Sequence, residues 1–161
     1  MEFRKNKSKV ICFYIIAFAV LSFFLWMIIE LLVKDKDKIV FEVIWLVASI
    51  IMSIKALISE LKQTVILNGN NIRCENFFVS GNLANATIEY NQIKSIQLKR
   101  SLFSVCLVIK VEGSEKFPVV LNNQFEDYIK LWQVICDGCK SRNPNAYIDC
   151  KIWDFLNKHS K

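Results

Sequence analysis

Two long, nearly continuous apolar stretches occupy the first part of the chain, at residues 10–33 and 39–58. A helix that crosses the hydrocarbon core of a bilayer needs about 20 apolar residues, and both stretches reach that length. The few charged residues within them lie toward their ends, where long side chains can reach the headgroups. The pattern therefore predicts two transmembrane helices, with spans at about 10–33 and 39–58.

Two other interpretations of these stretches are weaker. Helices that are apolar on all sides can be buried in a large soluble protein, but only about 100 residues remain here to cover them. A cleaved signal peptide would explain the basic start of the chain, but the first apolar stretch is longer than the roughly 7–15 residues of a signal-peptide core. No small-residue cleavage site follows it. We therefore expect the first stretch to be retained.

The connection between the two stretches predicts their topology. Five residues, 34–38, suffice only for a tight hairpin, so both chain ends are expected on one side of the membrane. Basic residues near span ends favour the cytoplasmic side. Six flank the terminal side and three lie in the connection, namely Arg4, Lys5, Lys7, Lys9, Lys55 and Lys62 against Lys34, Lys36 and Lys38. This predicts a multi-pass protein of the cell membrane with both termini in the cytoplasm.

Beyond residue 61 the pattern changes to short alternating runs that are typical of strands. Residues 64–67 and 72–78 flank Asn68-Gly69-Asn70-Asn71, and an Asn-Gly pair between apolar runs is a strong hairpin signal. Pro118 lacks an amide hydrogen, which predicts that the strand at 117–121 is an edge strand or carries a bulge. With the remaining runs, the pattern predicts five to seven antiparallel strands; the other runs are 86–90, 93–100 and 105–111.

A helical period follows the strands. Apolar residues recur at three- and four-residue steps over 125–139, with Asn123 expected as the N-cap and with Gly138 and Pro144 expected to end the helix. Residues 146–159 predict a second, short amphipathic helix. Because the strands come before the helix and their connections are short, the pattern predicts an α+β domain and excludes a doubly wound parallel sheet.

This order of elements resembles the bacterial membrane-anchored proteins with a pleckstrin-homology-like (PH-like) domain. The resemblance is carried by Asn68-Gly69-Asn70-Asn71, by residues 88–96, and by the helix and its stop at 125–144. It implies a tail and transmembrane hairpin at 1–61 and a cytosolic domain at 62–161. That domain would be a bent antiparallel sheet or partly open barrel of about seven strands, capped by a C-terminal helix.

The resemblance implies little about activity. Eukaryotic PH domains that bind phosphoinositides carry clustered basic residues in and after the first hairpin loop. Here that loop is Asn-Gly-Asn-Asn with only Arg73 nearby, so phosphoinositide recognition is not supported.

Composition excludes several classes of site. The chain carries 21 basic and 15 acidic residues, a mild excess, and no alternation of aromatic and basic residues of the RNA-binding kind. Four scattered glycines exclude a phosphate-binding loop, and one histidine excludes a site with two imidazoles. That residue, His159, lies near Asp154 in a terminal tail with nothing to fix a catalytic triad. We expect no nucleic acid, cofactor, metal or small-molecule substrate, and no enzymatic activity.

Cys136 and Cys139 form a CxxC motif, which has redox and metal-binding meanings. A zinc site would need two further ligands at suitable spacing, and a redox motif normally lies at the start of a helix rather than at its end. Both cysteines continue the apolar stripe of the predicted helix. We therefore interpret them as core residues with free thiols, as expected in a reducing cytoplasm.

Two groups of charged residues are candidate contact sites. Lys94, Lys99 and Arg100 are the densest basic group after the membrane region, and could contact anionic headgroups or a partner, or form a solvated strand face. Glu30 and Glu42 lie toward the same end of the two spans. They could contact a partner helix or mark an ion path, or pair locally with lysines of the connection.

The sequence thus predicts an integral membrane protein whose cytosolic PH-like domain is a membrane-tethered interaction module. Its partner would be a protein, a second copy or the bilayer surface. The alternative is an accessory or immunity-type subunit of a membrane complex that acts through its transmembrane helices. A membrane enzyme is the least favoured class, because no acid–base, nucleophile or metal constellation is present.

Overall fold

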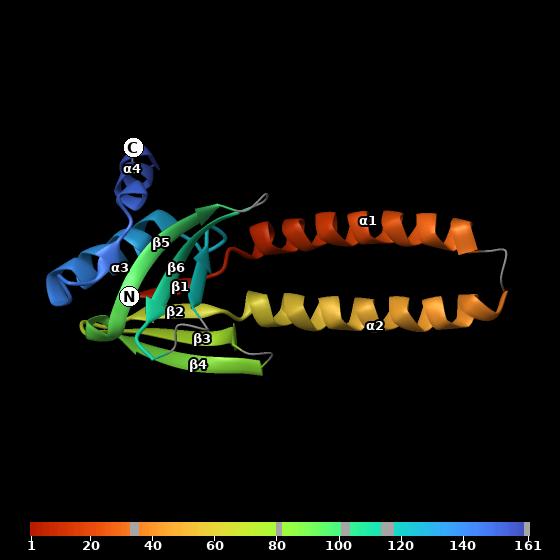
Figure 1. Cartoon of the computed structure of the whole chain (residues 1–161), viewed down its shortest axis with the longest axis horizontal. Coiled ribbons are helices and arrows are strands. Elements are labelled where there is room, and N and C mark those ends of the chain that lie inside the picture. Colours follow the sequence, from red (N-terminus) through yellow and green to blue (C-terminus); the bar gives the residue numbers. More distant parts are fainter. Residues whose placement is uncertain (33–35, 80–81, 101–103, 114–117, 160–161) are drawn as a thin grey trace. The chain divides into compact units, whose positions relative to one another are not determined.

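A computed structural model describes residues 1–32, 36–79, 82–100, 104–113 and 118–159, and the chain divides into two compact units. The helical unit is Lys7–Leu61. The sheet unit combines Met1–Asn6 with Lys62–Lys161 (Figure 1). The sheet unit is therefore discontinuous in sequence, and the first six residues, which the sequence places with the hairpin, belong to it.

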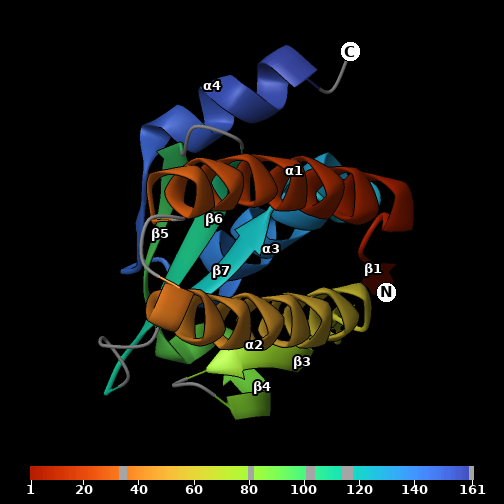
Figure 2. The ribbon, with the colours of Figure 1, turned by 90° about the vertical axis from the view of Figure 1, so that its right-hand side faces the viewer.

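The helical unit consists of α1 (Lys7–Leu32) and α2 (Lys36–Leu61), which lie side by side (Figure 2). Residues 34 and 35 of the predicted tight connection, with residue 33 before it, lie outside the described residues, and residues 36–38 belong to α2. Among the described residues, one segment, Lys7–Met27, is long and apolar enough to cross a membrane. This statement depends only on the length and composition of the helix. The core helix of a soluble protein or a signal sequence can have the same length and composition.

The sheet unit contains eight strands in two four-stranded sheets among the residues described. The first sheet has the order β1 (Glu2–Arg4), β2 (Thr64–Leu67), β3 (Asn71–Val79), β4 (Asn82–Glu89). The second has the order β7 (Val119–Asn122), β6 (Val105–Val111), β5 (Ile93–Arg100), β8 (Tyr147–Ile148). The predicted α+β class is confirmed. The partly open barrel is wrong, because the strands form two separate sheets.

Several predicted strands are confirmed in detail. The Asn-Gly turn joins β2 to β3, and the Asn68 amide donates to the Asn71 carbonyl at 3.0 Å. The strand that follows Pro118, β7, is an edge strand, which is one of the two predicted alternatives. The expectation that all strands are antiparallel and precede the helix is wrong. β8 follows the main helix and pairs in parallel with β5 through Ser95–Tyr147 and Ile96–Ile148.

The N-terminal strand β1 is the element that the sequence did not predict. It pairs with β2 through Glu2–Ile66, Phe3–Val65 and Arg4–Thr64. The α-amino group of Met1 also donates to the Leu67 carbonyl at 2.8 Å. A strand of three residues is too short to show an alternating pattern, which explains why it was missed. The two helices are thus inserted between two strands that are hydrogen-bonded to each other.

The main helix, α3 (Tyr128–Arg142), begins later than predicted. Its N-cap is Asp127, in the left-handed region at φ 49°, and not Asn123. Phe125 instead forms an isolated antiparallel bridge with Lys5, and the residues on either side of it are in turns, so the helix begins only after Asp127. Gly138 does not end the helix; it lies within α3, which continues to the residue before Asn143-Pro144. Proline disfavours helical backbone in the residue before it, so the stop at Pro144 is confirmed.

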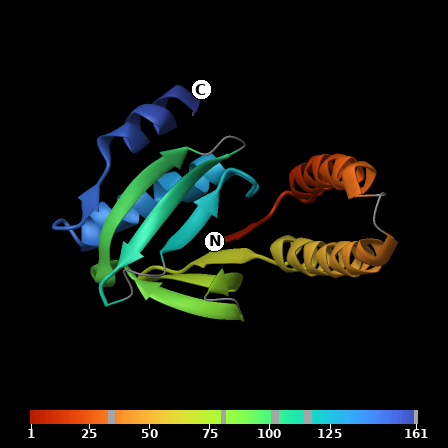
Figure 3. The ribbon, with the colours of Figure 1, turned by 45° about the vertical axis from the view of Figure 1, so that its right-hand side comes forward.

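The core of the sheet unit lies between its sheets and α3 (Figure 3). Trp132 is fully buried, with its ring 5.2 Å from that of Tyr128 and 5.6 Å from that of Phe155. The tail helix α4 (Cys150–His159) is confirmed as short and amphipathic, and it buries Ile152 and Leu156. A 3-10 turn, η1 (Tyr90–Gln92), links the two sheets.

Candidate functional site

The three basic residues predicted as a contact site all lie on β5 and are exposed. Lys94 is next to the first residue of the strand, whereas Lys99 and Arg100 are its last two, paired with Cys106 and Val105. At about 3.3 Å per residue, roughly 20 Å separates Lys94 from Arg100. The structure therefore does not bring the three together, and Lys94 belongs to the opposite end of the sheet.

Arg100 instead meets residues of α4. The space between β5 and α4 measures about 510 Å³ and is lined by Leu98, Arg100, Lys151, Asp154, Phe155, Lys158 and His159. We call this the β5–α4 groove.

The β5–α4 groove combines positive charge with an apolar floor. Its lining contains three basic residues, Arg100, Lys151 and Lys158, and one carboxylate, that of Asp154. Leu98 and Phe155 are partly buried and pack against the core. The His159 ring stacks on Phe155 with 4.3 Å between ring centroids, and its Nδ1 lies 2.8 Å from the Phe155 carbonyl oxygen. Such a surface suits an anion that carries an apolar part.

The sequence did not indicate this groove because β8 creates it. The bonds of β8 to β5, followed by the Asp149 amide donating to the Ile96 carbonyl at 3.0 Å, return the tail to the strand that carries Arg100. A two-residue parallel strand has no sequence signature. The spacing of Lys151, Asp154 and Lys158 on one face of a predicted helix was the available signal.

Lys5 is a buried residue of the sheet unit, with only 3% of its surface exposed. Its Nζ donates to Asn122 Oδ1 at 2.5 Å and to Gln124 Oε1 at 3.3 Å, and lies 4.7 Å from the centroid of the Phe125 ring. In the sequence, Lys5 is one of the basic residues that predict a cytoplasmic N-terminus. The structure gives it a second role, because it joins the N-terminal segment to the end of β7.

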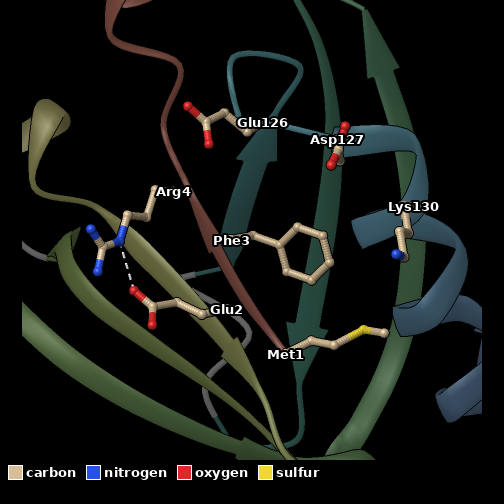
Figure 4. A pocket seen from close by; sticks show the side chains of 7 residues that line it. All are labelled: Met1, Glu2, Phe3, Arg4, Glu126, Asp127 and Lys130. Atoms are coloured by element: carbon tan, nitrogen blue, oxygen red, sulfur yellow. Dashed lines mark hydrogen bonds and ion pairs between the residues drawn. The ribbon is translucent and has the colours of Figure 1, made fainter.

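A second hollow, of about 380 Å³, lies between β1 and the start of α3 (Figure 4). Met1 and Phe3 point from β1 toward α3, while Glu2 and Arg4 point away and form an ion pair at 2.7 Å. Both signs of charge surround it, so it has no preference for one kind of ion. Its lining is Met1, Glu2, Phe3, Arg4, Glu126, Asp127 and Lys130.

The CxxC cysteines are core residues, as predicted. Cys136 and Cys139 are fully buried in α3 and are free thiols. Burial raises the pKa of Cys136 to about 12, with a further contribution from the neighbouring Cys139, and burial raises the pKa of Cys139 to about 11. Reactive cysteines have a lowered pKa, so these thiols are chemically quiet. Within the described part of the chain no group of His, Cys, Asp and Glu is arranged to hold a metal.

The two acidic residues of the predicted spans are only partly described. Glu30 lies near the end of α1 and is exposed. Glu42 lies in α2, but its side chain is outside the described part of the structure. Their proposed contacts remain predictions.

Comparisons of the chain with protein-family models, with curated proteins and with solved structures found no match. The PH-like resemblance therefore depends on the residues and the order of elements described above.

Proposed function

We propose that this chain is an integral membrane protein in which α1 and α2 cross the bilayer as a hairpin. The sheet unit is then a PH-like interaction module held at the cytoplasmic face, with both termini in the cytoplasm. The observation that carries this proposal is the pairing of β1 with β2 across the inserted helices.

The pairing limits the number of crossings. Arg4 and Thr64 are partners in one antiparallel ladder, so the residues before α1 and after α2 must lie on the same side of a membrane. A single crossing would place them on opposite sides. Cleavage after the first apolar stretch would remove β1 and the buried Lys5 from the folded unit. An inserted segment that crosses twice satisfies the pairing.

The surface of the helices supports insertion. Large apolar side chains of α1 and α2 are exposed, including Ile15 at 63%, Trp45 at 62% and Met52 at 74%. Exposed apolar surface that continues along two helices is typical of contact with lipid or a partner rather than with water. A tether at both ends of the hairpin confines the sheet unit to the membrane surface, and this raises its effective concentration toward partners there.

The element order supports the PH-like class. Strands β2 to β7 pair only in antiparallel fashion with one another and are followed by α3, whose buried residues belong to the same core; the short parallel strand β8 comes after α3. No residue constellation of an enzyme appears among the described residues, so recognition by a surface is the activity that the sheet unit supports best.

A second candidate, an accessory or immunity-type subunit that acts through its helices, is favoured by one observation. A hollow of about 530 Å³ separates α1 and α2, and small residues such as Ala17, Ser49 and Ser53 contribute to its lining. Small residues allow close approach of helices within membranes, so a third helix could pack there.

Topology is the direct test of the proposed function. A reporter that reads export should be active when fused at Lys36 and inactive when fused after Lys161, and the protein should resist alkaline extraction from membranes. An active reporter at the C-terminus, or release by alkaline extraction, would contradict the proposal.

Replacement of residues 10–58 by an unrelated transmembrane hairpin separates the two candidates. Retention of partner binding by the exchanged protein supports the sheet unit as the working part. Loss of binding, with the sheet unit still folded, supports the helices.

A further inference from the structure

One end of the sheet unit carries both connections to the helices, and hydrogen bonds define which residues share that end. The Asn6 amide donates to the Gln124 carbonyl at 2.7 Å, just before α1 begins. The Asn123 amide donates to the Val105 carbonyl at 3.0 Å, and Val105 is the strand partner of Arg100. A continuous row of paired backbone therefore joins the start of the hairpin to the end of β5 and the β5–α4 groove.

The second connection lies on the same row. Arg4 is paired with Thr64, which lies two residues after the exposed Lys62, and Lys62 directly follows α2. The Lys62 carbonyl also accepts a hydrogen bond from the Asn76 side-chain amide at 3.0 Å, which fixes this connection to β3. Both entry points are thus held by the same end of the sheet unit as Arg100.

We propose that this end of the sheet unit docks on the anionic headgroups of the bilayer that holds its own hairpin, with the β5–α4 groove as the basic contact. The proposal rests on the proposed function, because it requires the helices to lie in a membrane. It names the partner of the sheet unit as a lipid surface of negative charge.

Charge complementarity favours lipid as the occupant. Arg100, Lys151 and Lys158 outnumber the one carboxylate of the groove, Asp154, and basic residues near an anionic leaflet are attracted to it. The partly buried Leu98 and Phe155 supply an apolar floor beside these charges. Phosphate oxygens of a headgroup can accept hydrogen bonds from the guanidinium and ammonium groups, while the adjoining glycerol region contacts the apolar floor.

The distribution of charge also favours the β5–α4 groove over the other hollow as the contact with the membrane. The acidic residues Glu126 and Asp127 line the other hollow, with Lys130, and not the β5–α4 groove (Figure 4). Arg4 and Lys130 offset these carboxylates, so an anionic surface would attract the groove more strongly than this hollow. Docking would therefore set the orientation of the sheet unit as well as its distance from the membrane.

The test uses the full-length protein in lipid nanodiscs of two compositions, phosphatidylcholine alone and phosphatidylcholine mixed with phosphatidylglycerol. Hydrogen exchange of the α4 backbone amides reports docking, since α4 forms one wall of the groove. We expect slower exchange in the anionic discs, and loss of this difference at high salt, which screens the attraction. Equal exchange in both compositions would overturn the proposal, even if the hairpin is inserted.

Matched variants locate the contact. Arg100→Gln and Lys158→Gln should each lower the ratio of docked to undocked protein about fivefold, the effect of one basic residue near an anionic leaflet. Lys94→Gln, at the other end of the same strand, should leave the ratio unchanged. Equal effects of Arg100→Gln and Lys94→Gln would overturn the assignment to the groove. Exchange of each variant in neutral discs shows whether the sheet unit is folded.

The outcomes distinguish this proposal from the proposed function. A protein that inserts with the expected topology but shows no dependence on lipid charge refutes the docking alone. A protein that fails to insert refutes the proposed function.

Discussion

The two units of this protein differ in how far their large apolar side chains are buried. In the sheet unit Trp132 is fully buried and packs on Tyr128 and Phe155, whereas in α2 Trp45 is 62% exposed. The sheet unit therefore covers its apolar surface with its own residues. The helical unit leaves such surface uncovered, and its environment must supply the cover.

The boundary between the units adds a second difference. Basic residues occur on both sides of it, but Lys5 is buried and hydrogen-bonded within the sheet unit, while Lys7 in α1 is exposed. Residues two positions apart thus have different physical roles. Substitutions that compare equivalent residues across this boundary test the division directly.

The largest expected effect comes from the two tryptophans. Trp132→Ala should lower the free energy of unfolding of the sheet unit by about 3–5 kcal/mol, because it leaves a large cavity in the core. Trp45→Ala should change it by less than about 0.5 kcal/mol in detergent, since that ring lies outside any packed core. Denaturant unfolding of the full-length protein, followed by circular dichroism, measures both. A similar decrease in the free energy of unfolding for both variants would contradict the proposed difference in burial between the two units.

At the boundary, Lys5→Ala should lower the free energy of unfolding by about 2 kcal/mol. The substitution removes charge-assisted hydrogen bonds to Asn122 and Gln124 and the packing of the lysine stem on Phe125. Lys7→Ala is the matched control and should change stability by less than about 0.5 kcal/mol. Equal stability of the two variants would show that Lys5 contributes only to topology.

Local signals predicted the parts of the fold that depend on neighbouring residues. The β2–β3 hairpin, the strands β5 and β6 and the edge position of β7 follow from alternation, an Asn-Gly turn and one proline. The two shortest strands, β1 and β8, depend on partners far away in the sequence and carry too few residues to show a period. The division into two sheets was also not predicted; it falls between β4 and β5, which are joined by η1 and are not neighbours in a sheet.

The candidate site was predicted only in part, for the same reason. Arg100 could be selected from the local density of basic residues, but its neighbours Lys151 and Lys158 come from α4, which β8 brings back to β5. Lys94 was grouped with Arg100 because the two are close in the sequence. They lie near opposite ends of β5, however, and an extended strand places its two ends far apart. Grouping by strand position instead of sequence distance would have separated them.

Gly138 and Gly69 differ in the space around them, and substitution of each compares a packed part of the sheet unit with an open part. A Cβ added at Gly138 would lie 2.7 Å from Tyr90 Cζ, whereas a Cβ at Gly69 would meet no atom within 4 Å. Gly138→Ala should lower the free energy of unfolding by about 1–2 kcal/mol, because the clash exceeds the gain in helix propensity. Gly69→Ala should have a smaller effect. The same unfolding measurement checks both, and a stabilising Gly138→Ala would show that Tyr90 can move aside.

The smallest effect concerns the buried thiols and appears only at alkaline pH. Burial raises the pKa of Cys136 from its ordinary value of 9.0 to about 12 in the folded chain. Between these values the unfolded chain releases the thiol proton while the folded chain keeps it, so the unfolded state binds fewer protons and stability falls as the pH rises. This contribution is fully present below about pH 9 and decreases above it.

Cys136→Ala isolates that contribution, because the other titrating groups are common to both proteins. Between pH 9 and 10 the free energy of unfolding of the unsubstituted protein should fall faster than that of the variant, by about 1 kcal/mol per pH unit and at most about 1.4. The substitution also leaves a small cavity, but this lowers stability by the same amount at every pH and does not change the slope. Parallel slopes would mean that water reaches the thiol in the folded state, and that the α3 face of the core is not closed as Trp132 and its neighbours indicate.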